Sequence, residues 1–229
     1  MAMTALMMTG AMTGLHNMYS IKLKFSKPCE SLEGQSKWWG APDLPAGSPY
    51  PVVHCAEEGD EWDETLTFLC QIRCEDIAAL DPDGLLPHGG MLYFFAAVDY
   101  FLGMDSPLYT PIGPWRSENV RVMYSPSCEG LQPYEMHWED TGESVFRPAE
   151  KLEFESCGAC DEGFKLLGRP YMIDVNEEYD DDYVSLLQVD ENDAWGLHFY
   201  DCGMLFLLIR RSQLLGRDWE KTSACLHSY

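Results

Sequence analysis

A short skeleton that occurs twice is the feature of this sequence that most constrains its fold. Each copy reads lysine, two large apolar residues, glycine, any residue and proline, and each is followed by a glutamine near the end of an apolar run and then by Gly-Met-Leu and an aromatic run. The landmark residues are Lys37, Gly40, Pro42, Gln71 and Gly90 in the first half and Lys165, Gly168, Pro170, Gln188 and Gly203 in the second. Because the order is kept while the connecting lengths differ, the pattern predicts an internal duplication.

The apolar runs in both halves are short, rich in β-branched and aromatic residues, and bounded by glycine, proline and aspartate, which is typical of strands. The acidic start and Pro-Asp-Gly stop of residues 74–84 predict one short helix, and Gly216 favours the end of another over Ser212–Leu215. We therefore predict an α+β fold of two similar, mainly antiparallel β subdomains that arose by internal duplication, with a few short helices.

The chain of 229 residues is long enough to bury a substantial core, and we expect one compact unit made of four segments. Residues 1–20 form an N-terminal leader or first helix, and residues 21–114 form the first β-rich repeat. Residues 115–163 form an irregular middle segment in which "RVMYSPS" and "VFRPAEKLEFE" are the expected strands. Residues 164–229 form the second β-rich repeat.

Acidic residues far outnumber basic ones, with 38 Asp and Glu against 15 Lys and Arg and a net charge of −23. Such a chain repels nucleic acid and anionic membrane surfaces, so neither is an expected partner. Two acidic stretches, Glu57–Thr65 and Asp174–Tyr183, lie between the skeleton and the following glutamine in their respective halves, and we expect both to be solvent-exposed loops. The longest apolar runs are too short to span a bilayer, and nine scattered cysteines favour a reduced, cytoplasmic protein.

An ordered set of motifs extends this pattern over nearly the whole chain. The motifs are S-K-x-x-G-x-P-x-L-P at Ser36–Pro45, L-x-F-L-x-Q-I at Leu66–Ile72, L-P-x-x-G-x-L-Y-F-F at Leu86–Phe95, L-L-Q-x-D at Leu186–Asp190 and D-x-G-x-L-F at Asp201–Phe206. With them the chain resembles the YwqG-like family, a group of mainly bacterial proteins recognised as a domain of unknown function. The resemblance implies an α+β fold of two similar β subdomains, and it implies no known activity and no catalytic residues.

The sequence carries none of the common catalytic signatures, such as a phosphate-binding loop, a G-x-S-x-G elbow or an H-E-x-x-H zinc motif. His88 and His198 precede corresponding strands of the two halves, and Asp201 lies close to His198 in the sequence. They are weak candidates for a site in a cleft between the halves, because no nucleophile accompanies them. Satisfied structural histidines are the favoured alternative, and no catalytic residue or cofactor is assigned.

Cys157 and Cys160 are the one cysteine pair at metal or redox spacing. A structural zinc site needs two further ligands, and only the distant Cys128, Cys202 or His137 could supply them. A redox pair and a reduced pair in a loop are the alternatives, of which we favour the reduced pair, and no metal is assigned.

The bulk charge and the missing catalytic motifs together predict a non-catalytic protein-binding module with an acidic surface. Its expected partner is a basic protein, an immunity or antitoxin role is one version, and a monomer or weak dimer is the expected state. The alternative is a small-molecule-binding protein or enzyme with its site between the two repeats. The skeleton itself is interpreted as a structural corner in which Lys37 and Lys165 pair with carboxylates, and a ligand that claims either lysine stays open.

Overall fold

The computed structural model describes residues 19–28, 30–171, 179–180 and 182–228. The strands are β1 Ser20–Ser26, β2 Lys37–Trp38, β3 Asp43–Pro45, β4 Val52–Glu57, β5 Asp60–Thr65, β6 Thr67–Arg73, β7 Met91–Ala96, β8 Gly113–Pro114, β9 Val120–Ser125, β10 Leu131–Pro133, β11 Glu150–Cys157, β12 Lys165–Leu166, β13 Tyr183–Val189, β14 Met204–Arg210 and β15 Ser223–His227. The helices are α1 Cys74–Ile77 and α3 Arg211–Leu215, with 3-10 turns η1 Ala78–Leu80, η2 Asp99–Leu102, η3 Ser117–Asn119, η4 Asp193–Trp195 and η5 Trp219–Lys221.

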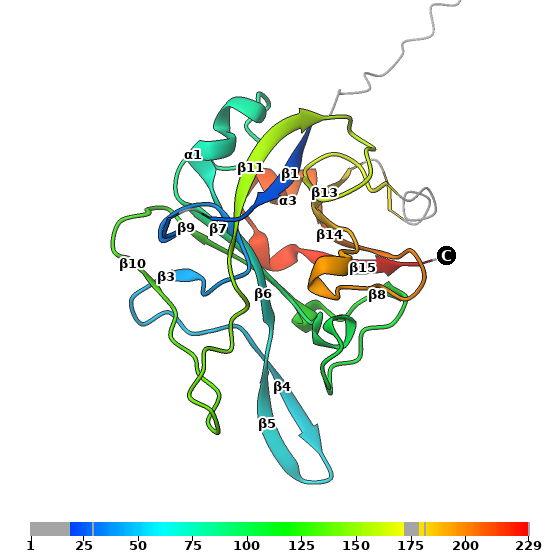
Figure 1. Ribbon diagram of the computed structural model, residues 1–229. Helices are drawn as coiled ribbons and strands as arrows, with labels where there is room; N and C mark the ends of the chain where they lie inside the picture. The colour runs from blue at the N-terminus through cyan, green and yellow to red at the C-terminus, as the bar shows by residue number, and fades with distance from the viewer. Residues whose placement is uncertain (1–18, 29, 172–178, 181, 229) are drawn as a thin grey trace, which may run out of the picture.

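One antiparallel sheet of 11 strands dominates the structure, in the order β8-β15-β14-β13-β12-β1-β11-β2-β6-β7-β9 (Figure 1). Two ribbons of two strands each, β10 with β3 and β4 with β5, complete the strand pairing among the described residues. The β4–β5 hairpin extends away from the body of the molecule, as Figure 1 shows at the bottom of the view.

The centre of the sheet is built from strands of opposite halves of the chain. Strand β1 pairs along its whole length with β11, from Ser20 opposite Cys157 to Ser26 opposite Lys151, and its other edge pairs with β12. Strand β11 in turn pairs with β2. Each short strand that begins a skeleton, β2 or β12, therefore lies beside the long strand contributed by the other half.

The sheet curls, because its two outermost strands are almost consecutive in the chain. Strand β8 pairs with β15 at one edge and β9 pairs with β7 at the other, and only residues 115–119 connect them. Trp115 anchors this connection by donating its backbone N–H to the carbonyl of Ala224 at 2.8 Å. A sheet whose edges are joined by so short a segment has to bend round its own core.

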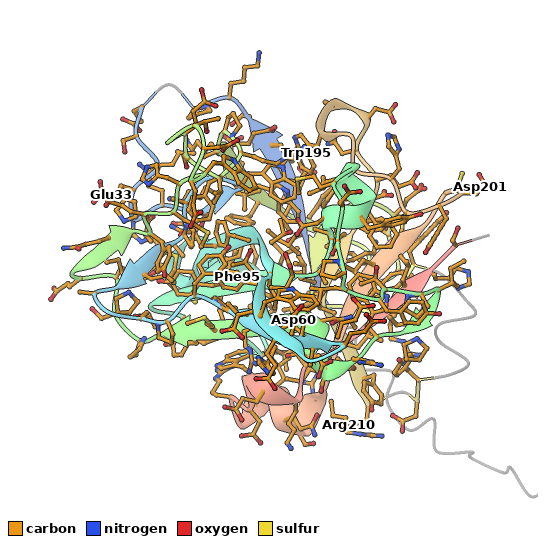
Figure 2. All side chains as sticks on the ribbon, turned by 90° about the horizontal axis from the view of Figure 1, so that it is seen from below. Glu33, Asp60, Phe95, Trp195, Asp201 and Arg210 are labelled. Atoms are coloured by element: carbon orange, nitrogen blue, oxygen red, sulfur yellow. The ribbon has the colours of Figure 1, made fainter. Side chains whose placement is uncertain are left out.

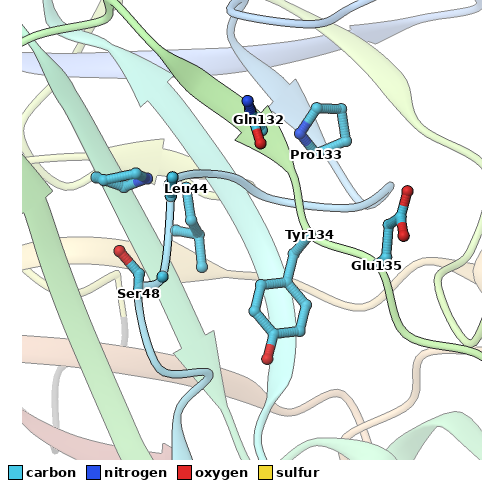
Figure 3. Close-up of a pocket in the computed structure, with 9 residues that line it drawn as sticks. Leu44, Ser48, Gln132, Pro133, Tyr134 and Glu135 are labelled. Atoms are coloured by element: carbon cyan, nitrogen blue, oxygen red, sulfur yellow. The ribbon is translucent and has the colours of Figure 1, made fainter.

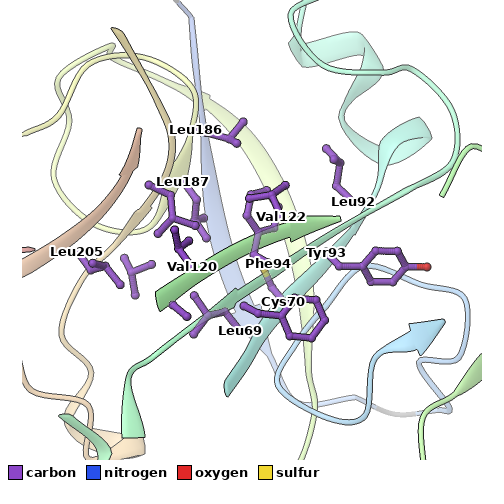
Figure 4. Close-up of a cluster of buried hydrophobic side chains, with 14 of the residues drawn as sticks. Leu69, Cys70, Leu92, Tyr93, Phe94, Val120, Val122, Leu186, Leu187 and Leu205 are labelled. Carbon is purple, nitrogen blue, oxygen red and sulfur yellow. The ribbon is translucent and has the colours of Figure 1, made fainter. Parts of the chain in front are cut away.

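The core lies inside this curl and draws side chains from both halves (Figure 4). All six residues of β7 are buried, as expected for a strand covered on both faces. Leu205 and Leu207 of β14 face the same cluster, whereas Phe206 and Leu208 pack in a smaller cluster with Cys225 on the other face. Burial of each large aliphatic or aromatic side chain contributes about 1.5–3 kcal/mol, so this core is the main source of stability.

The predicted α+β class with two subdomains is wrong. The described α-helices have only four and five residues, and the strands of the two halves join in a single sheet. The physical reason is that strands of the two halves pair with each other at the centre of the sheet. Strand β1 pairs with β11 and β12 rather than with strands of its own half. The segment boundaries predicted at residues 20, 114 and 163 stay a prediction.

Several local expectations can be compared with the described residues. Both expected helices are present as α1 and α3, and the expected strands of the middle segment are β9 and β11. The expectation of a loop over Glu57–Thr65 is wrong, because most of this stretch is β5 paired with β4. The second acidic stretch, 174–183, lies largely outside the described residues, as does most of the predicted leader at 1–20.

Candidate functional site

The first skeleton forms a buried ion pair. The ammonium of Lys37 lies 2.9 Å from Oδ2 of Asp43, and the two side chains are 6% and 0% exposed. Lys37 opens β2, and Asp43 opens β3 after the turn through Gly40 and Pro42. The predicted pairing of this lysine with a carboxylate is confirmed, and the burial leaves no access for a ligand to the ammonium.

Gln71 holds the two ends of this turn together. Its side-chain oxygen accepts the backbone N–H of Asp43 at 2.8 Å, and its Nε2 donates to Oδ2 of the same residue at 2.6 Å and to the carbonyl of Gln35 at 2.8 Å. The N–H of Gly34 donates to Oδ2 at 2.8 Å, and the hydroxyl of Tyr93 donates to the Asp43 carbonyl at 2.6 Å. A charged group buried without partners is costly, and these contacts satisfy one oxygen of the carboxylate fully.

The second skeleton repeats the glutamine contacts but not the ion pair. Oε1 of Gln188 accepts the backbone N–H of Tyr171 at 3.0 Å, and its Nε2 donates to the carbonyl of Gly163 at 2.7 Å. Tyr171 stands where the first corner has Asp43, so no carboxylate side chain occupies that position. The ammonium of Lys165 instead donates to the carbonyls of Ala159 at 2.8 Å and Arg169 at 2.9 Å.

Burial therefore dominates the chemistry of the second lysine. The Lys165 residue is 0% exposed, and burial lowers its pKa to about 8, an effect that the neighbouring Cys157, Cys160 and Asp161 partly oppose. The predicted pairing of Lys165 with a carboxylate is wrong, since its direct partners are neutral carbonyl groups.

The glycines of both skeletons are required by close packing as well as by backbone conformation. Gly40 has φ +76° and a side-chain carbon there would lie 2.7 Å from Cβ of Ala149, while at Gly168, with φ +83°, it would lie 1.9 Å from Oγ of Ser20. Only glycine adopts such φ values freely and allows this approach. Ala149 immediately precedes β11 and Ser20 begins β1, so each corner packs against the start of the other half's long strand.

Aromatic rings fill the space between the two corners. Trp38 stacks on Trp195 with ring centroids 5.6 Å apart and an interplanar angle of 13°, and Phe25 and Phe164 approach Trp38 edge-on. The guanidinium of Arg147 lies over the Trp39 ring, 5.5 Å from its centroid. In this region the predicted cleft between the halves is occupied by packed side chains.

The structure does not bring His88, His198 and Asp201 together. Nε2 of His88 lies 3.8 Å from Oδ2 of Asp81, before the start of β7. The backbone N–H of His198 donates to the carbonyl of Phe101, beyond the other end of β7, a strand whose six residues span roughly 20 Å. Both histidine side chains are about half exposed, and Asp201 is exposed with its backbone bonded to Ser228.

Cys157 is the last residue of β11, and Cys160 lies in the turn that follows it, at the second corner. Cys157 is half-buried and Cys160 is exposed. Within the described part of the chain, no group of three or more His, Cys, Asp or Glu side chains is placed to hold a metal ion.

A cavity of about 650 Å³ lies beside the first corner (Figure 3). Leu44 and Pro45, the last residues of the first sequence motif, line it together with Gln132 and Tyr134 from β10 and the residue that follows it. Figure 3 shows Tyr134 and Ser48 on either side of the opening. The motif thus has two parts, a buried lysine that is structural and an outer end that reaches a solvent-accessible hollow.

The β4–β5 hairpin concentrates negative charge on a projecting ribbon. Its exposed acidic residues are Glu57, Glu58, Asp60, Glu61 and Asp63, and Glu64 is partly exposed. Figure 2, seen from below, shows Asp60 on the near side of the molecule, well separated from Trp195 and Asp201. No lysine or arginine occurs in the sequence between Lys37 and Arg73, and within the hairpin His54 contacts Asp63, with Nδ1 3.1 Å from Oδ1.

A second cavity, of about 420 Å³, lies at the base of this hairpin. Val53, Cys55 and Trp62 line it from the hairpin, and Leu108 and Tyr109 line it from the segment before β8. Sequence reasoning missed the hairpin that borders this cavity, although Gly59 in the middle of the acidic stretch was a turn signal. Glu58 and Gly59 have φ +50° and +100°, the conformation of a two-residue hairpin turn between strands.

The fold and these features define a mostly β protein built on one curled antiparallel sheet, with an acidic hairpin and two open cavities. Residues 36–227 match the family described as "Domain of unknown function (DUF1963)", and the chain belongs to that family. No match was found among curated proteins. In the described part of the chain, no helix has both the length and the apolar character needed to cross a membrane.

Proposed function

We propose that this protein is a non-catalytic binding module that captures a basic protein through the β4–β5 hairpin. The observation that carries the proposal is the density of exposed carboxylates on residues 57–64, on a ribbon that projects from the body. A projecting acidic ribbon attracts a basic surface over a distance of about a Debye length and orients it before contact.

The cavity at the base of the hairpin supports a specific partner rather than general charge attraction. Binding energy in protein interfaces comes mainly from a few apolar or aromatic side chains in desolvated pockets, with charged residues around them. Trp62 and Leu108 offer such a pocket next to the carboxylate of Glu57, while the other carboxylate of the lining, Glu118, is paired with Arg116 at 3.5 Å. The proposed partner segment therefore carries lysine or arginine on both sides of one large apolar residue.

The remaining parts of the proposal concern biological setting. A partner of this kind is consistent with an immunity or antitoxin role, in which the acidic hairpin neutralises a basic toxin domain. We further propose that the chain is a cytoplasmic, YwqG-like member of its family and acts as a monomer or weak dimer, and that its acidic surface keeps it from nucleic acid and anionic membranes.

Charge neutralisation at two equal sites tests the proposal. The triple variant Asp60→Asn, Glu61→Gln, Asp63→Asn removes three charges from the hairpin, and Glu139→Gln, Asp140→Asn, Glu143→Gln removes three exposed charges from the β10–β11 connection. The probe is a synthetic peptide with a central tryptophan between lysine pairs, and its affinity is measured by calorimetry at low and moderate salt.

The hairpin variant should lose about tenfold in affinity or more, and the matched control should lose less than about threefold. An equal loss in both variants would show that the peptide responds only to net charge. The proposal would then fail.

A small-molecule site is a second candidate, and the cavity beside the first corner favours it. Its volume of about 650 Å³ falls within the range of ligand pockets, and residues of the first sequence motif line it. Ser48→Trp would fill the hollow from its partly exposed rim. A compound that raises the melting temperature of the native protein and not of this variant would support the site, and a compound that stabilises both equally would not.

A further inference from the structure

The loop Cys157–Asp161 is a tight turn held at three points. The N–H of Asp161 donates to the carbonyl of Gly158 at 3.1 Å, and the N–H of Gly158 donates to Oδ2 of Asp161 at 2.9 Å. Between them the Ala159 carbonyl accepts the Lys165 ammonium at 2.8 Å. The backbone between the two cysteines is therefore fixed by hydrogen bonds.

The Ala159 carbonyl also joins this turn to the rest of the second corner. It accepts the backbone N–H of Arg169 at 2.9 Å and the hydroxyl of Ser20 at 3.3 Å, in addition to the Lys165 ammonium. Cys157 ends β11 directly opposite Ser20 in the sheet. One cysteine is thus anchored in the central sheet, and the other lies in the turn above the buried lysine.

The two thiols differ in accessibility, which gives them different chemical roles. Cys160 is exposed, whereas Cys157 is half-buried. Burial raises the pKa of the Cys157 thiol, and the nearby Lys165 ammonium opposes this effect. The Lys165 ammonium lies 2.8 Å from the carbonyl of Ala159, which precedes Cys160 in the turn.

We propose that Cys157 and Cys160 form a reversible dithiol–disulfide site that exchanges with a small disulfide such as glutathione disulfide. The exposed thiolate of Cys160 attacks one sulfur of the small disulfide, forms a mixed disulfide and releases one thiolate. The thiolate of Cys157 then attacks the Cys160 sulfur, forms the internal disulfide and releases the second thiolate. The protein loses two thiol protons and two electrons, and the small disulfide takes them up as two thiols.

Other cysteines of the described residues do not offer this arrangement. Cys70, Cys74 and Cys225 are buried, and neither the exposed Cys202 nor the partly exposed Cys55 and Cys128 has a second cysteine within three residues of it. The hydrogen bonds that hold the turn use backbone and carboxylate groups and the Lys165 ammonium, so formation of a 157–160 disulfide removes none of their donors or acceptors. Reduction and oxidation can therefore alternate without unfolding the corner, since the hydrogen bonds of Ala159 and Asp161 involve no sulfur.

Peptide mapping provides a direct test, because residues 152–165 lie between Lys151 and Lys165 and contain Cys157 and Cys160 as their only cysteines. The folded protein is equilibrated with reduced and oxidised glutathione at a series of ratios, alkylated, digested with trypsin and analysed by mass spectrometry. The expected product in oxidising mixtures is this peptide with two hydrogens fewer and no alkyl group, and it should revert fully in reducing mixtures.

Three single variants define the outcome. Cys160→Ser should abolish reaction in this peptide, Cys157→Ser should stop at the glutathione adduct of Cys160, and Cys55→Ser, which changes a partly exposed cysteine elsewhere, should leave closure unchanged. If both thiols of the native protein remain open to alkylation in the most oxidising mixture, the proposal is wrong. It is equally wrong if Cys160 pairs with a cysteine outside this peptide.

Discussion

The two corners share one hydrogen-bonded frame but neutralise their buried lysines in different ways. Gln71 and Gln188 make matching contacts to the backbone of Asp43 and Tyr171, whereas only Lys37 has a carboxylate partner. The ammonium of Lys165 relies on two carbonyl groups, and burial lowers its pKa to about 8. The glutamine and the glycine thus define the corner, and the ion pair is an addition that one corner has and the other lacks.

Removal of the carboxylate should produce the largest effect. Asp43→Ala leaves the Lys37 ammonium buried without a counter-charge, and breaking one side of a buried ion pair costs about 3–5 kcal/mol in the free energy of unfolding. The measurement is urea denaturation followed by tryptophan fluorescence. Tyr171→Ala at the corresponding position is the control, and because Tyr171 is 38% exposed it should change stability by less than about 0.5 kcal/mol.

A loss for Asp43→Ala as small as that of Tyr171→Ala would erase the distinction between the corners. It would mean that the Lys37 ammonium finds other partners as easily as Lys165 does.

Replacement of the second glycine should have the next largest effect. Gly168→Ala combines φ +83° with a Cβ placed 1.9 Å from Ser20 Oγ, and we expect a loss of about 3 kcal/mol in the free energy of unfolding. Gly142→Ala, at φ +69° with no atom within 4 Å, isolates the conformational part and should cost about 1 kcal/mol. Equal losses of stability in the two variants would show that the close approach of Gly168 to Ser20 of β1 adds nothing to the cost of the substitution.

The smallest expected effect is the change that Lys165→Met makes in the pH dependence of the free energy of unfolding. The pKa of Lys165 is about 8 in the folded protein and 10.5 for an ordinary, solvated lysine, so between these values the unfolded state binds more protons and the contribution of Lys165 to stability rises with pH. Lys165→Met removes this rise. Relative to the native protein, the variant should therefore lose a further 1–2 kcal/mol, roughly, between pH 7.5 and 9.5.

The measurement is the difference between the native and variant urea curves at each pH, because cysteines and tyrosines of both proteins titrate in the same range. Lys37→Met serves as the comparison at the other corner. A constant difference between native protein and Lys165→Met across this range would show that the lysine is solvated in the folded state.

The corners could be predicted from the sequence because their determinants are local. A glycine and a proline two residues apart fix a turn, and the glutamine that closes it lies in the next strand along the main sheet. The absence of an ion pair at Lys165 depends on a single residue, because the second corner has Tyr171 at the position where the first corner has Asp43. Only the geometry reveals that these two residues share a position in the glutamine frame.

The fold class could not be derived in the same way, because it depends on the pairing of β1 with β11, two strands that lie far apart in the sequence. Both β1 and β11 alternate charged and apolar residues, so each is a credible strand, but alternation does not identify the partner. The acidic hairpin was missed for a different reason. Asp and Glu are depleted in strands, and a stretch as acidic as β5 favours a loop unless the turn at Glu58 and Gly59 is recognised.

Because β1 pairs with β11, a strand made much later, β1 stays unpaired for part of the time in which the chain is synthesised. The first strand leaves the ribosome as Ser20–Ser26, and its neighbours β11 and β12 are made only after residue 150. At about 5–20 residues per second, β1 spends roughly 6–25 seconds without the strands it will lie between. Over that interval Ile21, Leu23 and Phe25 lack the strands that flank them in the sheet, and Phe25 has Trp38 but not yet Phe164 or Trp195 to pack against, so the newly made chain depends on whatever shields this strand until its partners arrive.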